Sequence, residues 1–150
     1  MQSSRFQHKT ESAARGEQLH CFLETMMRML KPLKNINQKQ LQRTYDMTAE
    51  DLKYQLGEES KKSLFKFMEK VKRVVEVEKS SSKYRYDLVA IDIDNNTCII
   101  DWKTGQKYVK DIQQISSYLY EHIEAKAGYL VYLDLSEEIL IKKEECIINS

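Results

Sequence analysis

The stretch "YRYDLVAIDIDNNTCIIDWKTGQ", residues 84–106, contains two largely apolar runs separated by the polar residues 94–96. Val and Ile in both runs favour β-strands, and Asp-Asn-Asn tolerates the positive φ values of a tight connection. We therefore expect a hairpin whose strands cover 84–93 and 97–103. Thr104-Gly105 should end the second strand.

Three charged side chains stand out in this hairpin. Asp101 and Lys103 fall on one face of the second strand, and Trp102 falls on the other. With the turn at 94–96, Asp87 should pair near Lys103 and approach Asp101 diagonally. Half-buried acids at this spacing favour a divalent cation, Mg²⁺ or Mn²⁺, as their neutralising partner. The residues alone leave open a solvated hairpin with an Asp101–Lys103 ion pair.

Helical and strand patterns continue on both sides of the hairpin. Apolar or polar periodicity predicts helices over 16–30, 37–45, 60–72 and 108–125. Thr48 and Asp51 resemble a capping box that opens a short helix to Leu56, which Gly57 stops. Further strands are expected around 74–77, over 129–135 and, at a sheet edge, over 139–148. The order predicts an α/β sandwich with a mixed central sheet and an N-terminal helical part.

The helix predicted over 108–125 has two faces. Ile112, Ile115, Leu119 and Ile123 recur at helical spacing and should form its buried stripe. Tyr118 falls roughly opposite, and Gly128 should close the helix.

Composition places the chain among ordinary globular proteins. It has 150 residues, 41% hydrophobic and 31% charged, which suits a flexible N-terminus over 1–14 and one domain over 15–150. No apolar stretch is long enough to cross a membrane and no secretory signal is visible, so an intracellular location is expected. Three scattered cysteines without a CxxC pair argue against a zinc ribbon or an iron–sulfur cluster.

The charge is uneven along the chain. Residues 1–75 carry 15 Lys/Arg against 9 Asp/Glu, and residues 76–150 carry 9 against 14. A basic half beside an acidic half would fit a polyanion surface next to a cation pocket. Candidates for contacts with a nucleic-acid backbone are Lys61, Lys62, Lys66 and Arg73.

The hairpin resembles the core of the PD-(D/E)XK nucleases, specifically the RecB type, in which an Asp-bearing strand leads to a D-[YWF]-K-T-G ending. "RGEQLHCFLE", residues 15–24, is similar to the family's R-G-x-x-x-H helix, and "QISSY", residues 114–118, to its Q-x-x-x-Y motif. "GYLVYL", residues 128–133, resembles the following strand. The motifs span 15–133 in the family's order, although Tyr86 stands where the proline of the name would be.

The resemblance implies a restriction-endonuclease-like fold and assigns the site. It implies Asp87, Asp101 and Lys103 as catalytic residues. It implies Asp87, Asp101, the Trp102 carbonyl and His20 as ligands of one or two Mg²⁺ or Mn²⁺ ions. Gln114 and Tyr118 would position the site and the nucleic acid. Apart from the resemblance, Tyr118 or Tyr84 could stack on a base if the substrate is single-stranded. Glu24, one turn from His20, could support it.

The resemblance also implies a function. The expected activity is metal-dependent hydrolysis of DNA, as an exonuclease acting on single strands or ends. Similar domains occur in CRISPR-associated adaptation nucleases and the mitochondrial genome-maintenance exonuclease, whose iron–sulfur cysteines, where present, have no counterpart here. A helicase or another replication or recombination protein would be a fitting partner, and a minimal nuclease would suit a virus or mobile element.

Two alternatives stay open. One is an RNA endonuclease like the cap-snatching domains of segmented negative-strand viruses, which use a similar set of residues. The other is a non-catalytic module that binds nucleic acid with the same fold.

Overall fold

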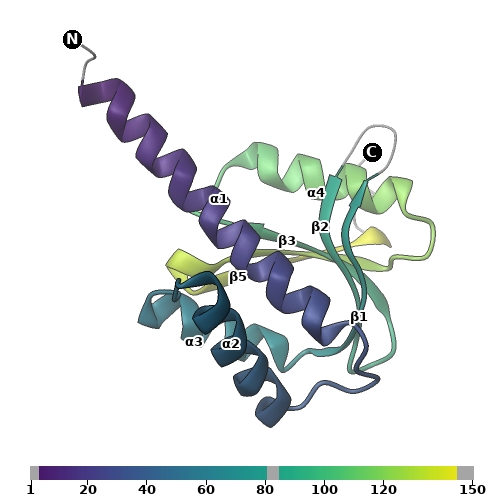
Figure 1. Cartoon of the computed structure of the whole chain (residues 1–150). Helices are drawn as coiled ribbons and strands as arrows, with labels where there is room; N and C mark the ends of the chain where they lie inside the picture. The colour runs from purple at the N-terminus through teal and green to yellow at the C-terminus, as the bar shows by residue number, and fades with distance from the viewer. Residues whose placement is uncertain (1–3, 81–84, 145–150) are drawn as a thin grey trace.

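The structure is a computed structural model that describes residues 4–80 and 85–144, with the side chains of 16–78 and 85–144 (Figure 1). The helices are α1 (Ser4–Leu30), α2 (Gln38–Leu52), α3 (Glu58–Met68), α4 (Val109–Glu121) and the 3-10 turn η1 (Leu133–Leu135). The strands are β1 (Val71–Ser80), β2 (Arg85–Asp92), β3 (Thr97–Lys103), β4 (Ala127–Tyr132) and β5 (Glu137–Lys142). Among these described residues, the helices lack the combination of length and apolar character that spanning a membrane requires.

The strands form one mixed sheet in the order β1-β2-β3-β4-β5. Neighbouring strands are antiparallel except β3 and β4, which run parallel. Parallel neighbours need a crossover connection, and α4 provides it. β5 lies at the edge as predicted, and residues 145–148 of its expected extent lie outside the described residues. The mixed sheet with flanking helices confirms the predicted α/β sandwich.

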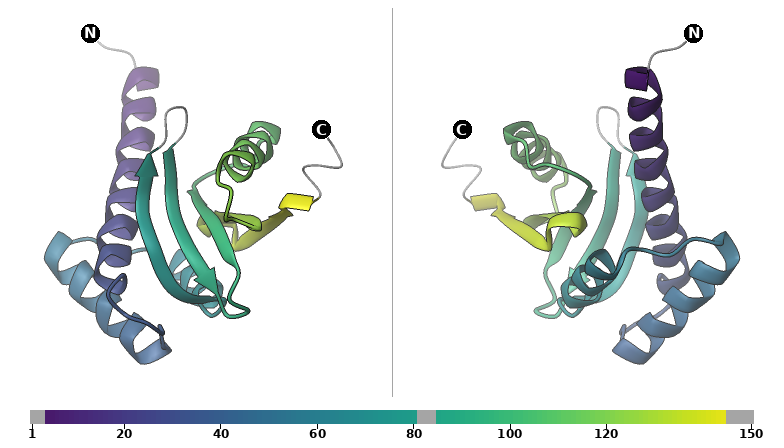
Figure 2. Two further views of the ribbon diagram at one scale, coloured as in Figure 1. Left: turned by 90° about the vertical axis from the view of Figure 1, so that its right-hand side faces the viewer. Right: turned by 90° about the vertical axis from the view of Figure 1, so that its left-hand side faces the viewer.

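The helices cover both faces of this sheet (Figure 2). One face packs against α1, α2 and α3 through a large apolar cluster that includes Leu23, Leu64, Leu88 and Trp102. The other face packs against α4 through a smaller cluster centred on Ile99, Ile115 and Leu130. Successive side chains of β3 point to opposite faces of the sheet and so pack into different clusters. Trp102 therefore lies on one face, and Asp101 and Lys103 lie on the other.

The turn between β2 and β3 lies slightly earlier than predicted. The Asp92 carboxylate accepts hydrogen bonds from the backbone N–H groups of Asp94 and Asn96, both at 2.9 Å. Asn95 adopts a φ of 65°, in the left-handed region that Asn tolerates. These bonds centre the loop on Asp94, so the strands pair in a different register from the one that a turn at 94–96 gives.

The first two helices differ from the prediction. α1 begins at Ser4, so residues 4–14, expected as a flexible N-terminus, continue the helix past the rest of the molecule (Figure 1). α2 is one helix rather than two, and its capping box is formed by Asn37 and Gln40. The predicted box at Thr48 was wrong because its hydroxyl instead donates to the Thr44 carbonyl inside the helix, at 2.8 Å.

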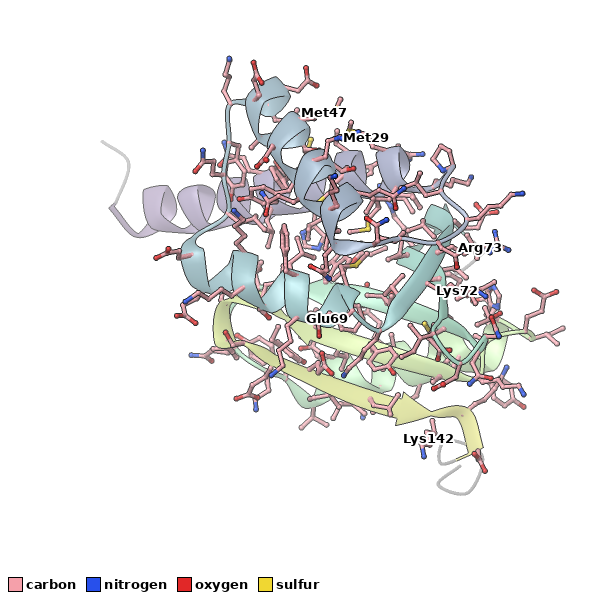
Figure 3. All side chains as sticks on the ribbon, turned by 90° about the horizontal axis from the view of Figure 1, so that it is seen from below. Met29, Met47, Glu69, Lys72, Arg73 and Lys142 are labelled. Carbon is pink, nitrogen blue, oxygen red and sulfur yellow. The ribbon has the colours of Figure 1, made fainter. Side chains whose placement is uncertain are left out.

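α1 and α2 pack side by side. Met29 of α1 and Met47 of α2 lie near one another on their outer surface (Figure 3), and the Thr48 hydroxyl lies 3.5 Å from the Met29 sulfur. Lys53, with a φ of 54°, ends α2, so no helix runs to the predicted stop at Gly57. α3 likewise ends at Met68 rather than Lys72, since β1 already begins at Val71.

The buried face of α4 is rotated from the predicted stripe. Ile115 and Leu119 are buried, but Ile112 is 38% exposed and Ile123, beyond the helix end, is 90% exposed. Asp111 and Tyr118 complete the buried face instead. Gly128 does not close this helix; it belongs to β4 and packs under Ile115.

Candidate active site

The two predicted catalytic acids come together at the end of the β2–β3 hairpin. The ladder pairs Leu88 with Ile100, so the register brings Asp87 opposite Asp101, two residues from the predicted pairing near Lys103. Beyond that pair the Asp87 carboxylate accepts the Trp102 N–H at 2.9 Å, taking the place of the next backbone acceptor. The Asp101 residue is only 5% exposed. Two carboxylates are therefore held side by side in a largely buried position.

Lys103 adds a positive charge on the Asp101 side of the sheet. Its ammonium lies 3.0 Å from an Asp101 oxygen and donates to the Gln114 side-chain oxygen of α4 at 2.9 Å. Gln114, the first residue of the Q-x-x-x-Y pattern, therefore contacts Lys103 directly. Gly105, with a φ of 75°, follows the end of β3 and lets the chain leave toward α4.

His20 reaches this hairpin from α1. Its Nδ1 lies 2.9 Å from the Gly16 carbonyl and its Nε2 lies 3.1 Å from the Trp102 carbonyl. The Nε2 atom is also 3.6 Å from an Asp87 oxygen. Because oxygen acceptors face both ring nitrogens, the ring serves as a donor at both and is an imidazolium in this arrangement.

Asp87, Asp101 and His20 shift one another's pKa values. The nearby Asp87 carboxylate is the main cause that raises the pKa of His20 to about 9, against the opposing effect of its burial. Burial is the largest single influence on Asp87 and by itself would raise its pKa, but the contacts with His20, Asp101 and the Trp102 N–H together hold the pKa below its ordinary value. Burial, followed by the charge of Asp87, raises the pKa of Asp101 to about 7. A bound cation would relieve this repulsion.

Asp111 also belongs to the site, although the sequence did not indicate it. It is 7% exposed and accepts a hydrogen bond from the Tyr132 hydroxyl at 2.9 Å. Its other carboxylate oxygen lies 3.9 Å from the Lys103 ammonium. An Asp in a first helical turn usually signals only a helix start, so the local pattern did not distinguish Asp111 from an ordinary capping residue.

Two predicted residues lie elsewhere. Glu24 forms an ion pair with Arg28 at 2.7 Å, one turn along the exposed side of α1. Tyr118 is 3% exposed and its ring packs against Tyr86, with centroids 4.7 Å apart. Burial therefore does explain Tyr118, and stacking of its ring on a base is incompatible with this position. Tyr84 lies outside the described residues.

The suggested backbone-contact residues are scattered. Arg73 lies next to Lys72, whose ammonium bonds Asn95 at the hairpin turn, at the end of the sheet away from Lys103 (Figure 3). The length of β3 separates the two ends by about 20 Å. Lys61 lies over the Tyr45 ring at 4.6 Å. These positions give no single basic surface beside the two acids.

The oxygen donors at the hairpin suit a hard cation. They are the two carboxylates of Asp87 and Asp101 and the Trp102 carbonyl, the types that Mg²⁺ and Mn²⁺ prefer. Among the described residues, His, Cys, Asp and Glu side chains do not form a group of three or more that could hold a metal ion. The predicted His20 ligand would need to release the proton that it donates to Trp102.

Comparison with known proteins does not identify the chain. The sequence matches no model of a protein family, and no curated protein matches it. Function is therefore inferred from the residues and their arrangement.

Proposed function

We propose that this protein is a divalent-metal-dependent nuclease that hydrolyses phosphodiester bonds of DNA, at single strands or ends. The observation that carries the proposal is the adjacency of Asp87 and Asp101 with the ammonium of Lys103 at 3.0 Å from Asp101. The raised pKa of Asp101, caused first by burial and then by Asp87, supports a place for additional positive charge. The alternative, a solvated ion pair between Asp101 and Lys103, does not account for a second carboxylate held beside Asp101 in a largely buried position.

The residues that would hold Mg²⁺ or Mn²⁺ are Asp87, Asp101 and the backbone carbonyl of Trp102. When bound, such an ion supplies Lewis-acid activation of water and of the phosphate. Asp101 would serve in its deprotonated form, because a carboxylate binds a cation better than a carboxylic acid does. Trp102 holds its carbonyl in place because its ring packs in the core against Phe67, 5.8 Å between centroids.

Lys103 is the proposed group that acts on the reacting phosphate. Its ammonium would donate to a phosphate oxygen or orient the attacking water as negative charge develops. Asp101 and Gln114 hold this flexible side chain in one position before substrate arrives. Such positioning lowers the cost of ordering the lysine during the reaction.

His20 has two compatible roles in this proposal. As an imidazolium it donates to the Trp102 carbonyl and neutralises part of the Asp87 charge. After losing the Nε2 proton, it could become the histidine ligand that the family pattern implies. Replacement by Gln, which keeps a donor without a titrating charge, separates donation from charge.

The test is digestion of end-labelled single-stranded DNA, duplex DNA and RNA with Mg²⁺, Mn²⁺ or EDTA. We expect cleavage of DNA that requires the metal and falls at least about 100-fold in Lys103→Ala, since removing one transition-state donor costs on that order. Lys142→Ala is the matched control because Lys142 is exposed and lies at the opposite end of the sheet (Figure 3).

Each arm of the digestion has a stated consequence. Equal cleavage by wild type and Lys103→Ala, or cleavage unaffected by EDTA, would refute the catalytic assignment. Preferential cleavage of RNA would replace the DNA substrate with the RNA alternative. Absence of cleavage, together with Mn²⁺ binding that Asp101→Ala leaves unchanged in calorimetry, would favour the non-catalytic module.

A further inference from the structure

Tyr108 stands exposed beside the candidate active site. It precedes α4 and is 52% exposed, although its ring is large and mostly apolar. It lines two hollows, one of about 460 Å³ shared with Lys103 and Gln114 and one of about 470 Å³ on the side of Gly16 and Tyr54. Tyr108 therefore borders open space both on the Lys103 side and on the Gly16 side.

Local structure does not account for a tyrosine at this position. The residue that caps a helix N-terminus is usually Ser, Thr, Asp or Asn, whose short side chain accepts a backbone N–H. Tyr108 has no short acceptor of this kind, and its backbone carbonyl takes the Asp111 N–H instead; its 52% exposure excludes a core role. The informative feature is an exposed aromatic ring next to buried charged groups.

The backbone of Tyr108 is fixed relative to Lys103. Its N–H donates to an Asp111 carboxylate oxygen at 3.2 Å, and its carbonyl accepts the Asp111 N–H at 3.0 Å. The same Asp111 side chain lies 3.9 Å from the Lys103 ammonium. Asp111 thus links the position of the exposed ring to that of the proposed catalytic lysine.

A second cation accompanies the ring. The Lys110 ammonium lies 5.2 Å from the centroid of the Tyr108 ring, within the range of a cation–π contact, and Lys110 is exposed. An aromatic ring with a nearby basic side chain is the combination that proteins use to bind single-stranded nucleic acid. The ring contacts a base, and the cation contacts the adjacent phosphate.

We propose that Tyr108 is a substrate-binding residue on which a base of a single-stranded nucleic acid stacks, next to the phosphate that Lys103 approaches. Lys110 contacts the phosphate on the same stretch of strand. This inference rests on the proposed nuclease function and assigns its recognition of single strands to a particular residue. Bases inside a duplex are already stacked on both faces, so they are not available to the ring.

The test compares Tyr108→Ala and Tyr108→Phe in binding a labelled oligothymidine and a duplex of equal length, in EDTA so that metal-dependent cleavage does not interfere. Tyr108→Ala should weaken oligothymidine binding at least about tenfold, equivalent to about 1.4 kcal/mol. Tyr108→Phe, which keeps the ring, should stay within about twofold, and duplex binding should change less than oligothymidine binding. Tyr120→Ala is the matched control, since Tyr120 is 75% exposed and lies near the other end of α4.

Two further measurements separate stacking from loss of structure. A single abasic nucleotide, moved along the oligothymidine, should weaken wild-type binding at one position and leave Tyr108→Ala insensitive there. Lys110→Ala should reduce the slope of log affinity against log salt by about 0.7, the contribution of one phosphate contact on a single strand.

The outcomes distinguish this inference from the proposed function. If wild type cleaves DNA while Tyr108→Ala binds oligothymidine as well as Tyr120→Ala does, the stacking role is wrong and the nuclease proposal stands. A wild-type abasic profile that is uniform along the strand also overturns the stacking role. If wild type neither binds nor cleaves nucleic acid, the proposed function has failed and the stacking role with it.

Discussion

Replacement of Gly128 by Ala should show how closely α4 packs on the sheet. A Cβ atom at Gly128 would lie 2.7 Å from Cγ1 and 3.2 Å from Cδ1 of Ile115, and 3.3 Å from Cδ1 of Leu119. Ordinary carbon contacts are about 3.5–4.0 Å, so the closest approach overlaps by roughly 1 Å. Both neighbours are buried side chains of α4, so relief requires the helix or the strand to move.

The expected magnitude follows from this overlap. Adding a methyl group to a packed core usually costs about 1–3 kcal/mol, and we expect the free energy of unfolding to fall by that amount. In a chain of this size the change corresponds to a melting temperature lower by about 2–12 °C. Urea unfolding followed by circular dichroism should show a lower midpoint with an unchanged m-value, as expected for a change in stability alone.

Gly57→Ala is the matched control. Gly57 has no heavy atom within 4 Å of an added Cβ, and its φ of −58° suits alanine. Both substitutions restrict the unfolded chain, so their difference reports on the folded protein. It reflects the contact at Gly128 and the weaker capping of α3 by Ala at position 57. We expect Gly57→Ala to change stability by no more than about 0.5 kcal/mol. Equal stability of Gly128→Ala and Gly57→Ala would refute the close packing of α4 on β4.

A double-mutant cycle sharpens the result. Ile115→Ala removes the atoms nearest the added methyl group and should itself cost about 2–5 kcal/mol. In the double variant with Gly128→Ala, the new methyl group occupies part of the space that Ile115 leaves. The combined loss should therefore be smaller than the sum of the two single losses. Additive losses would show that the two residues do not meet.

Two further predictions concern the site. The folded-state pKa of His20, about 9, is above its ordinary 6.5, so its contribution to stability is present below pH 6.5 and is lost as pH rises through about 9. In EDTA, the wild-type urea midpoint should fall over that interval relative to His20→Gln, and parallel midpoints would contradict the ion pair with Asp87. Asp111→Ala should cost about 1–3 kcal/mol in urea unfolding, because the buried Tyr132 hydroxyl loses its acceptor. The exposed control Asp46→Ala should stay within about 0.5 kcal/mol, and an equal loss in both variants would contradict the role of Asp111.

The sequence predicted the hairpin and the faces of its side chains well, because both depend only on neighbouring residues in the chain. Alternating directions along a strand placed Asp101 and Lys103 on one face and Trp102 on the other, and the structure confirms this separation. The register was wrong because it depends on where the turn begins. The Asp92 side chain decides that by bonding the N–H groups of Asp94 and Asn96, a capping interaction that apolar periodicity does not reveal.

The errors on α4 have a tertiary cause. Its apolar residues suggested a stripe through Ile112 and Ile123, but the helix ends at Glu121 and the sheet covers only part of its length. Tyr118 is buried because it meets Tyr86 of β2, a contact between residues far apart in sequence. Helical spacing shows which side chains share a face but does not show how far the neighbouring layer extends.

Asp111 shows why the polar part of the site was the hardest to predict. Its three interactions come from three elements: the Tyr108 backbone before α4, the Tyr132 hydroxyl of β4 and the Lys103 ammonium at the end of β3. Each interaction alone is ordinary, and the sequence contains no spacing that joins them. Only the parallel pairing of β3 with β4 brings Tyr132 opposite Lys103 and so gives Asp111 both partners. The topology of the sheet therefore determines that Asp111 lies in the site. For Asp87 and Asp101, strand periodicity was enough to predict that they face the same side.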